Sequence, residues 1–227
     1  MKKSEAIFLS IAGCILAAIL IPFIYTRLSC SRMARDHLSE NYSFAAEQTG
    51  FRYNFLEDIY YVEFTTKDLT PAVSFSVRIQ HGKKAINTTF ESEAAKLRLN
   101  AFFQEEASRL WENDSRVITN IDFLMTPAGN DIREEILNLP IEDILSFEMH
   151  SFSIKILLEG SCDEAHARSG LAEICRMLES RECPEFGIYV FFSPTGRDND
   201  WYYDSYTTSN KEFHQNRASE KALEAFS

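Results

Sequence analysis

Apolar positions are most concentrated near the amino end of this chain. Residues 6–25 read AIFLSIAGCILAAILIPFIY, twenty residues without a charge. A helix rises about 1.5 Å per residue, so this run is about 30 Å long and matches the apolar core of a bilayer. Two lysines precede the run and Arg27 follows it. The pattern predicts a short cytoplasmic tail (1–5) and a transmembrane signal-anchor helix (6–26) in contact with the lipid bilayer.

Two processed forms of this segment are alternatives. A secretory signal peptide has a shorter apolar core, roughly 7–15 residues, and a small-residue cleavage pattern, which does not follow here. Ile11–Cys14 resembles a bacterial lipoprotein box, yet twelve further uncharged residues (15–26) come after its fourth residue. An uncleaved anchor fits better, and acylation of Cys14 stays open.

Orientation depends on the basic residues that flank the span. Lys2 and Lys3 lie on the amino side, whereas Arg27, Arg32 and Arg35 lie on the carboxyl side. The Lys/Arg bias is therefore nearly balanced. A short basic tail before an apolar run favours a single-pass protein of the cell membrane with its amino terminus inside and its domain outside.

Beyond the span, the hydrophobic pattern predicts strands and helices in clusters. Residues 72–80 alternate apolar and polar side chains, as an antiparallel strand with one buried face does, and should pair with 59–65 as a hairpin. Residues 92–113 carry apolar side chains on one helical stripe. Further strands are expected at 116–124, 152–158, 186–193 (central) and 200–207 (edge), and further helices at 31–48, 163–181 and 209–226.

Clustered rather than strictly alternating elements favour an α+β fold, with antiparallel sheets packed against helices after the transmembrane helix. The Pro/Gly-containing segment TPAGN after residue 125 is the clearest boundary. It divides the chain into a first α+β module (27–125) and a second one (126–227), which can also pack as one domain.

Three segments carry a family resemblance: the spacing Ala34-x-x-x-Leu38-x-x-x-Tyr42, the segment Tyr61–Phe64, and the strand that contains Phe75. With the anchor, this layout resembles membrane-anchored proteins of low-GC Gram-positive bacteria with PepSY-like or cystatin-like extracytoplasmic modules. The resemblance covers about residues 1–110. It implies a helix packed on an antiparallel sheet, and no functional residue is carried over. Four cysteines outside the span depart from that group.

Composition narrows the function classes. The 227 residues contain 23 Lys+Arg and 34 Asp+Glu, a formal net charge of −11. Nucleic acid is not expected as a partner, because phosphate binding needs a basic surface. An ordinary share of apolar residues, 45%, indicates a folded domain.

Motifs for catalysis, cofactors and metals are not found. The sequence lacks the phosphate-loop, dinucleotide-binding, zinc-protease and nucleophile-elbow patterns, and its five histidines are scattered. A calcium loop starting at Asp198 would need an oxygen ligand and a glycine where Tyr202 and Tyr203 stand. No cofactor, metal site or catalytic residue is therefore predicted.

Cysteine usage leaves two interpretations open. A disulfide among Cys162, Cys175 and Cys183 is one interpretation, and buried free thiols are the equal alternative. Neither a C-x-x-C pair nor zinc spacing is present. Next to Cys162, the carboxylates of Asp163 and Glu164 oppose thiolate formation, which argues against a nucleophile.

One aromatic, acidic segment is a candidate binding surface. Rigid rings give a large contact area at small entropic cost, so such runs are typical of recognition surfaces. An edge strand packed on the core is the alternative. The candidate residues are Trp201, Tyr202, Tyr203, Asp204 and Tyr206.

These features favour a non-catalytic role. The sequence predicts a membrane-anchored extracytoplasmic domain that binds a protein, peptide or envelope component. The alternatives are an envelope hydrolase that uses Asp198, Asp200 and Asp204, and a cytosol-facing regulator of another membrane protein, which would keep its thiols reduced.

Overall fold

A computed structural model describes the backbone of residues 3–80, 85–111, 116–125, 133–146, 149–181, 183 and 185–226. Side chains are described for these residues except 3–17, 19, 85–86, 116–125, 133, 149–151 and 161. The chain divides into two compact units, Met1–Phe90 (the first unit) and Glu91–Ser227 (the second unit). Each unit is described by itself.

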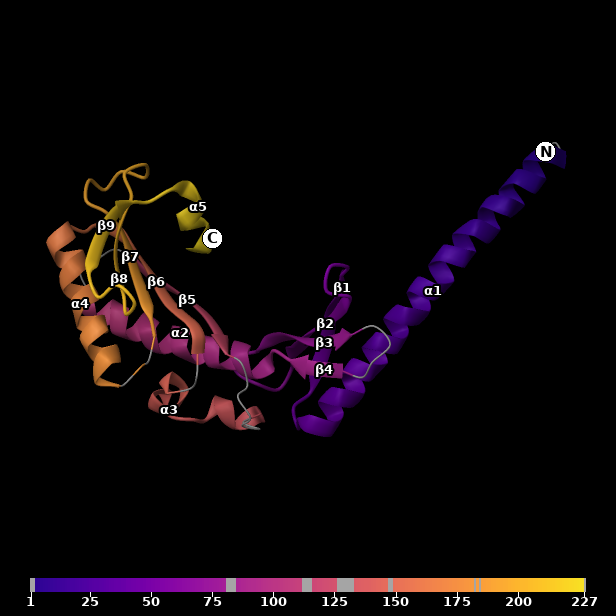
Figure 1. The fold of residues 1–227 in the computed structure, drawn as a ribbon, viewed down its shortest axis with the longest axis horizontal. Helices are drawn as coiled ribbons and strands as arrows, with labels where there is room; N and C mark the ends of the chain where they lie inside the picture. Colours follow the sequence, from indigo (N-terminus) through magenta and orange to yellow (C-terminus); the bar gives the residue numbers. More distant parts are fainter. Residues whose placement is uncertain are drawn as a thin grey trace. The chain divides into compact units, whose positions relative to one another are not determined.

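The first unit is one long helix on a four-stranded antiparallel sheet with the order β1-β2-β3-β4 (Figure 1). The C-terminal part of the helix packs on the sheet through Cys30, Ala34 and Leu38, which are buried at helical spacing. The predicted hairpin of β2 and β3 is confirmed, with Val62 opposite Val77. The elements are α1 (Lys3–Asn41), β1 (Ala46–Asn54), β2 (Ile59–Thr66), β3 (Ser74–Gln80) and β4 (Ala85–Thr88).

The helix predicted over 31–48 is wrong in two respects. α1 is continuous from Lys3 to Asn41, so no separate helix follows the apolar run. The segment after it is β1, which pairs with β2 and contains an irregularity between Gln48 and Gly50. A Cβ atom on Gly50 would lie 2.0 Å from Glu63 Oε2, so the Glu63 side chain passes over this glycine and would have to move for any larger residue.

The apolar run forms part of α1. Across the residues whose side chains are described, no helix is long and apolar enough to cross a membrane. The predicted transmembrane segment (6–26) falls mostly on residues 6–17 and 19, whose side chains lie outside that set.

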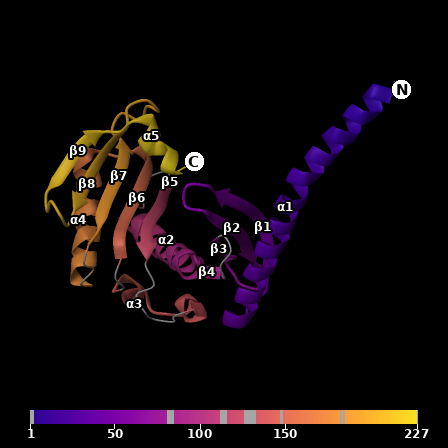
Figure 2. The same ribbon diagram turned by 45° about the vertical axis from the view of Figure 1, so that its right-hand side comes forward.

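The second unit is a five-stranded sheet with the order β5-β6-β7-β8-β9 (Figures 1 and 2). On one face of this sheet lie α2 and α4, and α5 lies on the other (Figures 1 and 2). Phe103 of α2 packs on Phe152 of the sheet, and Trp111 approaches Gly170 of α4. Its elements are α2 (Phe90–Leu110, beginning at the last residue of the first unit), β5 (Arg116–Met125), η1 (Arg133–Leu137), α3 (Ile141–Leu145), β6 (Met149–Ser161), α4 (Glu164–Ser180), β7 (Gly187–Ser193), β8 (Tyr202–Thr207), β9 (Phe213–Arg217), α5 (Glu220–Leu223) and η2 (Glu224–Phe226).

The α+β class is confirmed, but the second sheet is mixed. β6 and β7 are parallel, because α4 connects them as a crossover of the kind that parallel neighbours require. The predicted boundary after residue 125 does not coincide with the division at Phe90. β5 and β6 pair along their length across that boundary, which keeps them in one unit.

The carboxyl end differs most from the sequence prediction. β8 lies between β7 and β9, so it is not an edge strand, and the edge strand at this end of the sheet is β9. The predicted helix over 209–226 is wrong. Its first part is β9, whose five residues are all exposed, and only four residues of α5 and a 3-10 turn follow.

Candidate functional site

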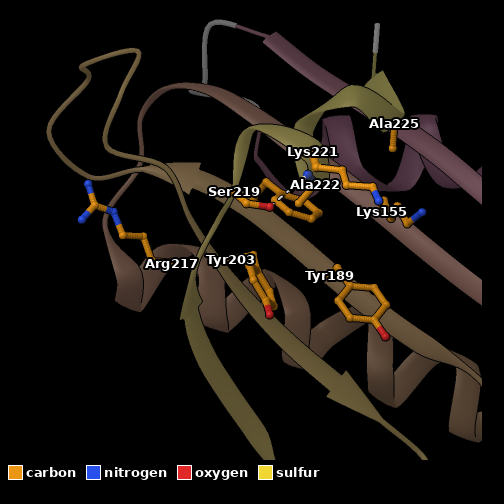
Figure 3. Close-up of a pocket in the computed structure, with 9 residues that line it drawn as sticks. Lys155, Tyr189, Tyr203, Arg217, Ser219, Lys221, Ala222 and Ala225 are labelled. Carbon is orange, nitrogen blue, oxygen red and sulfur yellow. Dashed lines mark hydrogen bonds between the residues drawn. The ribbon is translucent and has the colours of Figure 1, made fainter.

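A pocket of about 340 Å³ lies on the face of the second sheet that carries α5 (Figure 3). Its strand side presents Tyr189 and Phe191 of β7 and Tyr203 of β8, and α5 supplies Lys221 and Ala222. The full lining is Lys155, Tyr189, Phe191, Tyr203, Arg217, Ser219, Lys221, Ala222 and Ala225.

Strand alternation puts the floor residues on one face. Lys155 is opposite Tyr189 in the parallel β6–β7 pair, and Phe191 is opposite Tyr203 in the antiparallel β7–β8 pair. Directly opposite residues of paired strands share a face. The Phe191 and Tyr203 ring centroids are 5.4 Å apart, and those of Tyr189 and Tyr203 are 6.3 Å apart. The floor is therefore a continuous set of aromatic rings.

Two contacts hold α5 and η2 over this floor, and a side-chain cap fixes the start of α5. Ser219 caps α5 by accepting a hydrogen bond from the backbone N–H of Ala222 at 3.3 Å. Just before the cap, the Ala218 N–H donates to the Trp201 carbonyl at 3.0 Å. The Phe226 ring meets Phe191 edge-on at 5.5 Å. A short, exposed terminal helix is thereby fixed to the sheet at both ends.

The pocket has the opposite charge to the chain as a whole. Its described lining residues include Lys155 and Lys221 and no acidic side chain, in a protein with a formal net charge of −11. Arg217 contributes to the wall, but Figure 3 shows its guanidinium pointing away, where Asp200 lies 3.9 Å from it. Ring faces, ammonium groups and hydroxyls suit the binding of an anion on an apolar stem.

The aromatic segment predicted as a binding surface is divided between the two faces of β8. Only Tyr203 lines the pocket. Asp204 and Tyr206 are buried against α4, where the Tyr206 hydroxyl donates to Glu179 Oε1 at 2.9 Å. Tyr202 packs near Phe192 on that same face. Trp201, half-buried, precedes the strand. Asp204 and Tyr206 therefore lie in the core, whereas Tyr202 is half-buried on that face.

The three acids of the hydrolase alternative do not converge. Asp204 is fully buried beside Arg168, with Oδ2 and Nε 2.9 Å apart. Burial raises the pKa of Asp204, and the Arg168 guanidinium opposes this in part. Asp198 is exposed in the loop before β8, and Asp200 accepts a hydrogen bond from the Thr195 hydroxyl at 3.3 Å. The buried carboxyl of Asp204 thus belongs to a structural ion pair.

The structure agrees with the second interpretation of the cysteines, buried free thiols. Cys162, Cys175 and Cys183 form no disulfide, and neither does Cys30. Burial raises the pKa of Cys175 to about 12, with a contribution from Glu179. It raises the pKa of Cys183 to about 11. Such thiols are poor nucleophiles near neutral pH.

The part of the chain whose side chains are described offers no metal site. These described residues contain no group of three or more His, Cys, Asp or Glu side chains placed to hold an ion.

The sequence contained one usable signal for the residues it missed. Successive side chains of a strand point to opposite faces of the sheet. Because Ile154 and Ile156 are buried on one face, Lys155 between them must point to the other face. Tyr189 and Phe191 are hidden in a nearly continuous apolar strand, in which periodicity does not separate the two faces. Lys221 follows from no local pattern.

Comparison of the chain with protein-family models, curated proteins and solved structures gives no match. The resemblance of residues 1–110 to PepSY-like or cystatin-like proteins therefore stays a prediction.

Proposed function

We propose that this protein is a membrane-anchored extracytoplasmic binding module whose pocket takes an anionic group on an apolar or aromatic stem. The observation that carries the proposal is the pairing of an aromatic floor with Lys155 and Lys221 in an acidic protein. A peptide with carboxylate and aromatic side chains has this chemistry, and a binding partner of that class supplies both halves of the contact.

The anchor half of the proposal is supported by α1. Leu20, Ile21, Phe23, Ile24 and Tyr25 are exposed, and five such positions within six residues point all around a helix. Helices that are apolar on every side are stable only inside a protein core or a membrane. The uncharged run extends from here toward the amino end to residue 6, long enough for a bilayer.

The pocket is tested with two small probes that differ in charge. The full chain is placed in phosphatidylcholine nanodiscs, and saturation-transfer NMR is recorded with phenylacetate and with phenethylamine. We expect transfer to phenylacetate and little to phenethylamine. Replacing both lysines (K155A/K221A) should weaken phenylacetate binding about tenfold or more, because a hydrogen bond to a charged group contributes about 1.5–3 kcal/mol.

The matched control is K67A/K211A, which removes the same charge from exposed positions outside the pocket. It should bind phenylacetate as the unmodified protein does. Equal transfer to both probes, or equal loss in the two double variants, would contradict the proposed pocket chemistry. Empty nanodiscs give the lipid background.

The location of the domain is tested with a new thiol. Cys30, Cys162, Cys175 and Cys183 are buried, so we expect a membrane-impermeant maleimide to leave all four unlabelled in intact cells. Ser209→Cys adds a thiol at an exposed position of the β8–β9 turn. Labelling of this variant in intact cells is the expected result, read by mass. Labelling only after lysis would instead place the domain in the cytosol.

A further inference from the structure

The β1–β2 turn presents an unusual pair of side chains. Phe55 and Leu56 are 76% and 82% exposed, more than any other large apolar side chain in the described part of the chain. Tyr53, at the end of β1, is 44% exposed beside them. An exposed apolar cluster at a hairpin tip disfavours contact with water and favours contact with a partner or a membrane.

Polar groups of this turn are directed back onto the strands. The Tyr53 hydroxyl donates to Asp58 Oδ1 at 2.8 Å, and the Tyr61 hydroxyl donates to Glu57 Oε2 at 2.9 Å. Asn54 Oδ1 accepts a hydrogen bond from the Leu56 N–H at 3.1 Å. Held in this way, the acidic side chains leave the outer end of the turn to the two apolar residues.

The turn extends toward the apolar half of α1. Gln48 donates to the Ser31 hydroxyl at 3.1 Å, and three residues further along β1 the Phe51 ring lies 5.7 Å from the Arg27 guanidinium. β1 therefore runs opposite to α1, toward the end of the apolar run. Phe55 is four residues beyond Phe51, about 13 Å of strand. Figure 1 shows the turn on the upper side of the first sheet, the side toward which the N-terminal half of α1 projects.

Side chains along this edge are those found at a membrane–water interface. The rings of Tyr53 and Tyr60 stack with centroids 4.5 Å apart, and exposed Tyr25 ends the apolar run. Tyrosines are enriched at headgroup level, and the polar layer on each side of a bilayer is about 5–7 Å thick. Transmembrane helices also tilt by about 20° on average, and a tilt toward the hairpin brings the turn closer to the lipid.

We infer that Phe55 and Leu56 are a second membrane contact, inserting into the headgroup layer of the same bilayer that residues 6–25 cross. This rests on the proposed anchor and assigns a partner, the lipid surface, to a second element of the first unit. Two separate contacts fix the rotation of the first unit about α1. Glu57 and Asp58 at the turn favour zwitterionic over anionic lipid.

The test measures contact with lipid directly. Leu56→Cys is labelled with the fluorophore NBD in the full chain, which is placed in phosphatidylcholine nanodiscs that contain a fraction of doxyl-labelled phosphatidylcholine. We expect the doxyl lipid to quench most of this emission. Lys67→Cys is the matched control, because it is exposed in the β2–β3 turn at the opposite end of the sheet, and its NBD emission should be unchanged.

Each result has one meaning. Quenching of Leu56→Cys without quenching of Lys67→Cys supports the second contact. If neither is quenched while the protein still co-migrates with the disc, the second contact is refuted and the anchor stands. Failure to enter discs at all refutes the anchor, and this inference with it. A blue shift without quenching that grows with protein concentration indicates contact between copies and also refutes it. Unmodified protein, carried through labelling, is the blank.

Discussion

Gly170→Ala is expected to destabilise the protein by about 2 kcal/mol, although alanine is the better helix former. A Cβ atom at this position of α4 would lie 2.2 Å from Cζ2 of Trp111, whose side chain is fully buried and rigid. Overpacking of a core costs about 1–3 kcal/mol, and the closeness of this contact argues for the upper end. The gain in helix propensity offsets about 1 kcal/mol of that cost.

Urea unfolding of the full chain, followed by circular dichroism, measures this change. Ser169→Ala, one residue away on the exposed side of α4, should leave the free energy of unfolding within about 0.5 kcal/mol of the unmodified value. In a double-mutant cycle, Trp111→Phe with Gly170→Ala should cost less than the sum of the single changes, because the clashing ring is smaller. Equal stability of Gly170→Ala and Ser169→Ala would show that α4 and Trp111 are not packed so closely.

Elements with a buried face were the ones that the sequence could predict. Residues 72–80 and 152–158 alternate because one side of each strand is in the core, and the helices at 92–113 and 163–181 have one apolar stripe for the same reason. A buried face imposes its period on the sequence. This is why the α+β class follows from the pattern.

β1 and β9 were missed because neither has such a face throughout. β9 is exposed at all five positions, so its pairing with β8 leaves no alternation to detect. In β1, the Glu63 side chain lies over Gly50, and glycine is a residue that usually marks a helix end or a turn. The pairing of β1 and β9 with their neighbours depends on strands elsewhere in the chain, so the local sequence does not predict it.

The candidate site was predicted less well than the fold. Of the aromatic segment, Tyr203 alone reaches the pocket, since adjacent residues of a strand point to opposite faces. The other side chains of the floor come from β6 and β7, 12 or more residues away in sequence, and the wall comes from a terminal helix of four residues. Strand order determines this juxtaposition, and no single segment contains it.

Arg168→Met is expected to destabilise the protein by about 3 kcal/mol at pH 7. The change leaves the Asp204 carboxylate, fully buried beneath α4, without its guanidinium partner at 2.9 Å. Removing one member of a buried ion pair costs about 3–5 kcal/mol, and the lower end applies because 40% of the Arg168 side chain is exposed. Arg176→Met on the same helix breaks only an exposed pair with Glu173 and should cost less than about 1 kcal/mol.

Acid should reduce this loss. Burial already raises the pKa of Asp204, and without Arg168 the pKa rises further. A carboxyl with a raised pKa in the folded state binds its proton more tightly there than when unfolded, so stability falls as pH increases from about 4 through the raised value. The deficit of Arg168→Met is then largest above that window and smallest below about pH 4, as urea unfolding at a series of pH values would reveal.

Adding Asp204→Asn removes the buried charge and should recover most of the stability at pH 7 while abolishing the pH dependence of the deficit. A deficit that is independent of pH, or no larger than that of Arg176→Met, would mean that the carboxylate is hydrated and that β8 is held under α4 by its apolar neighbours alone.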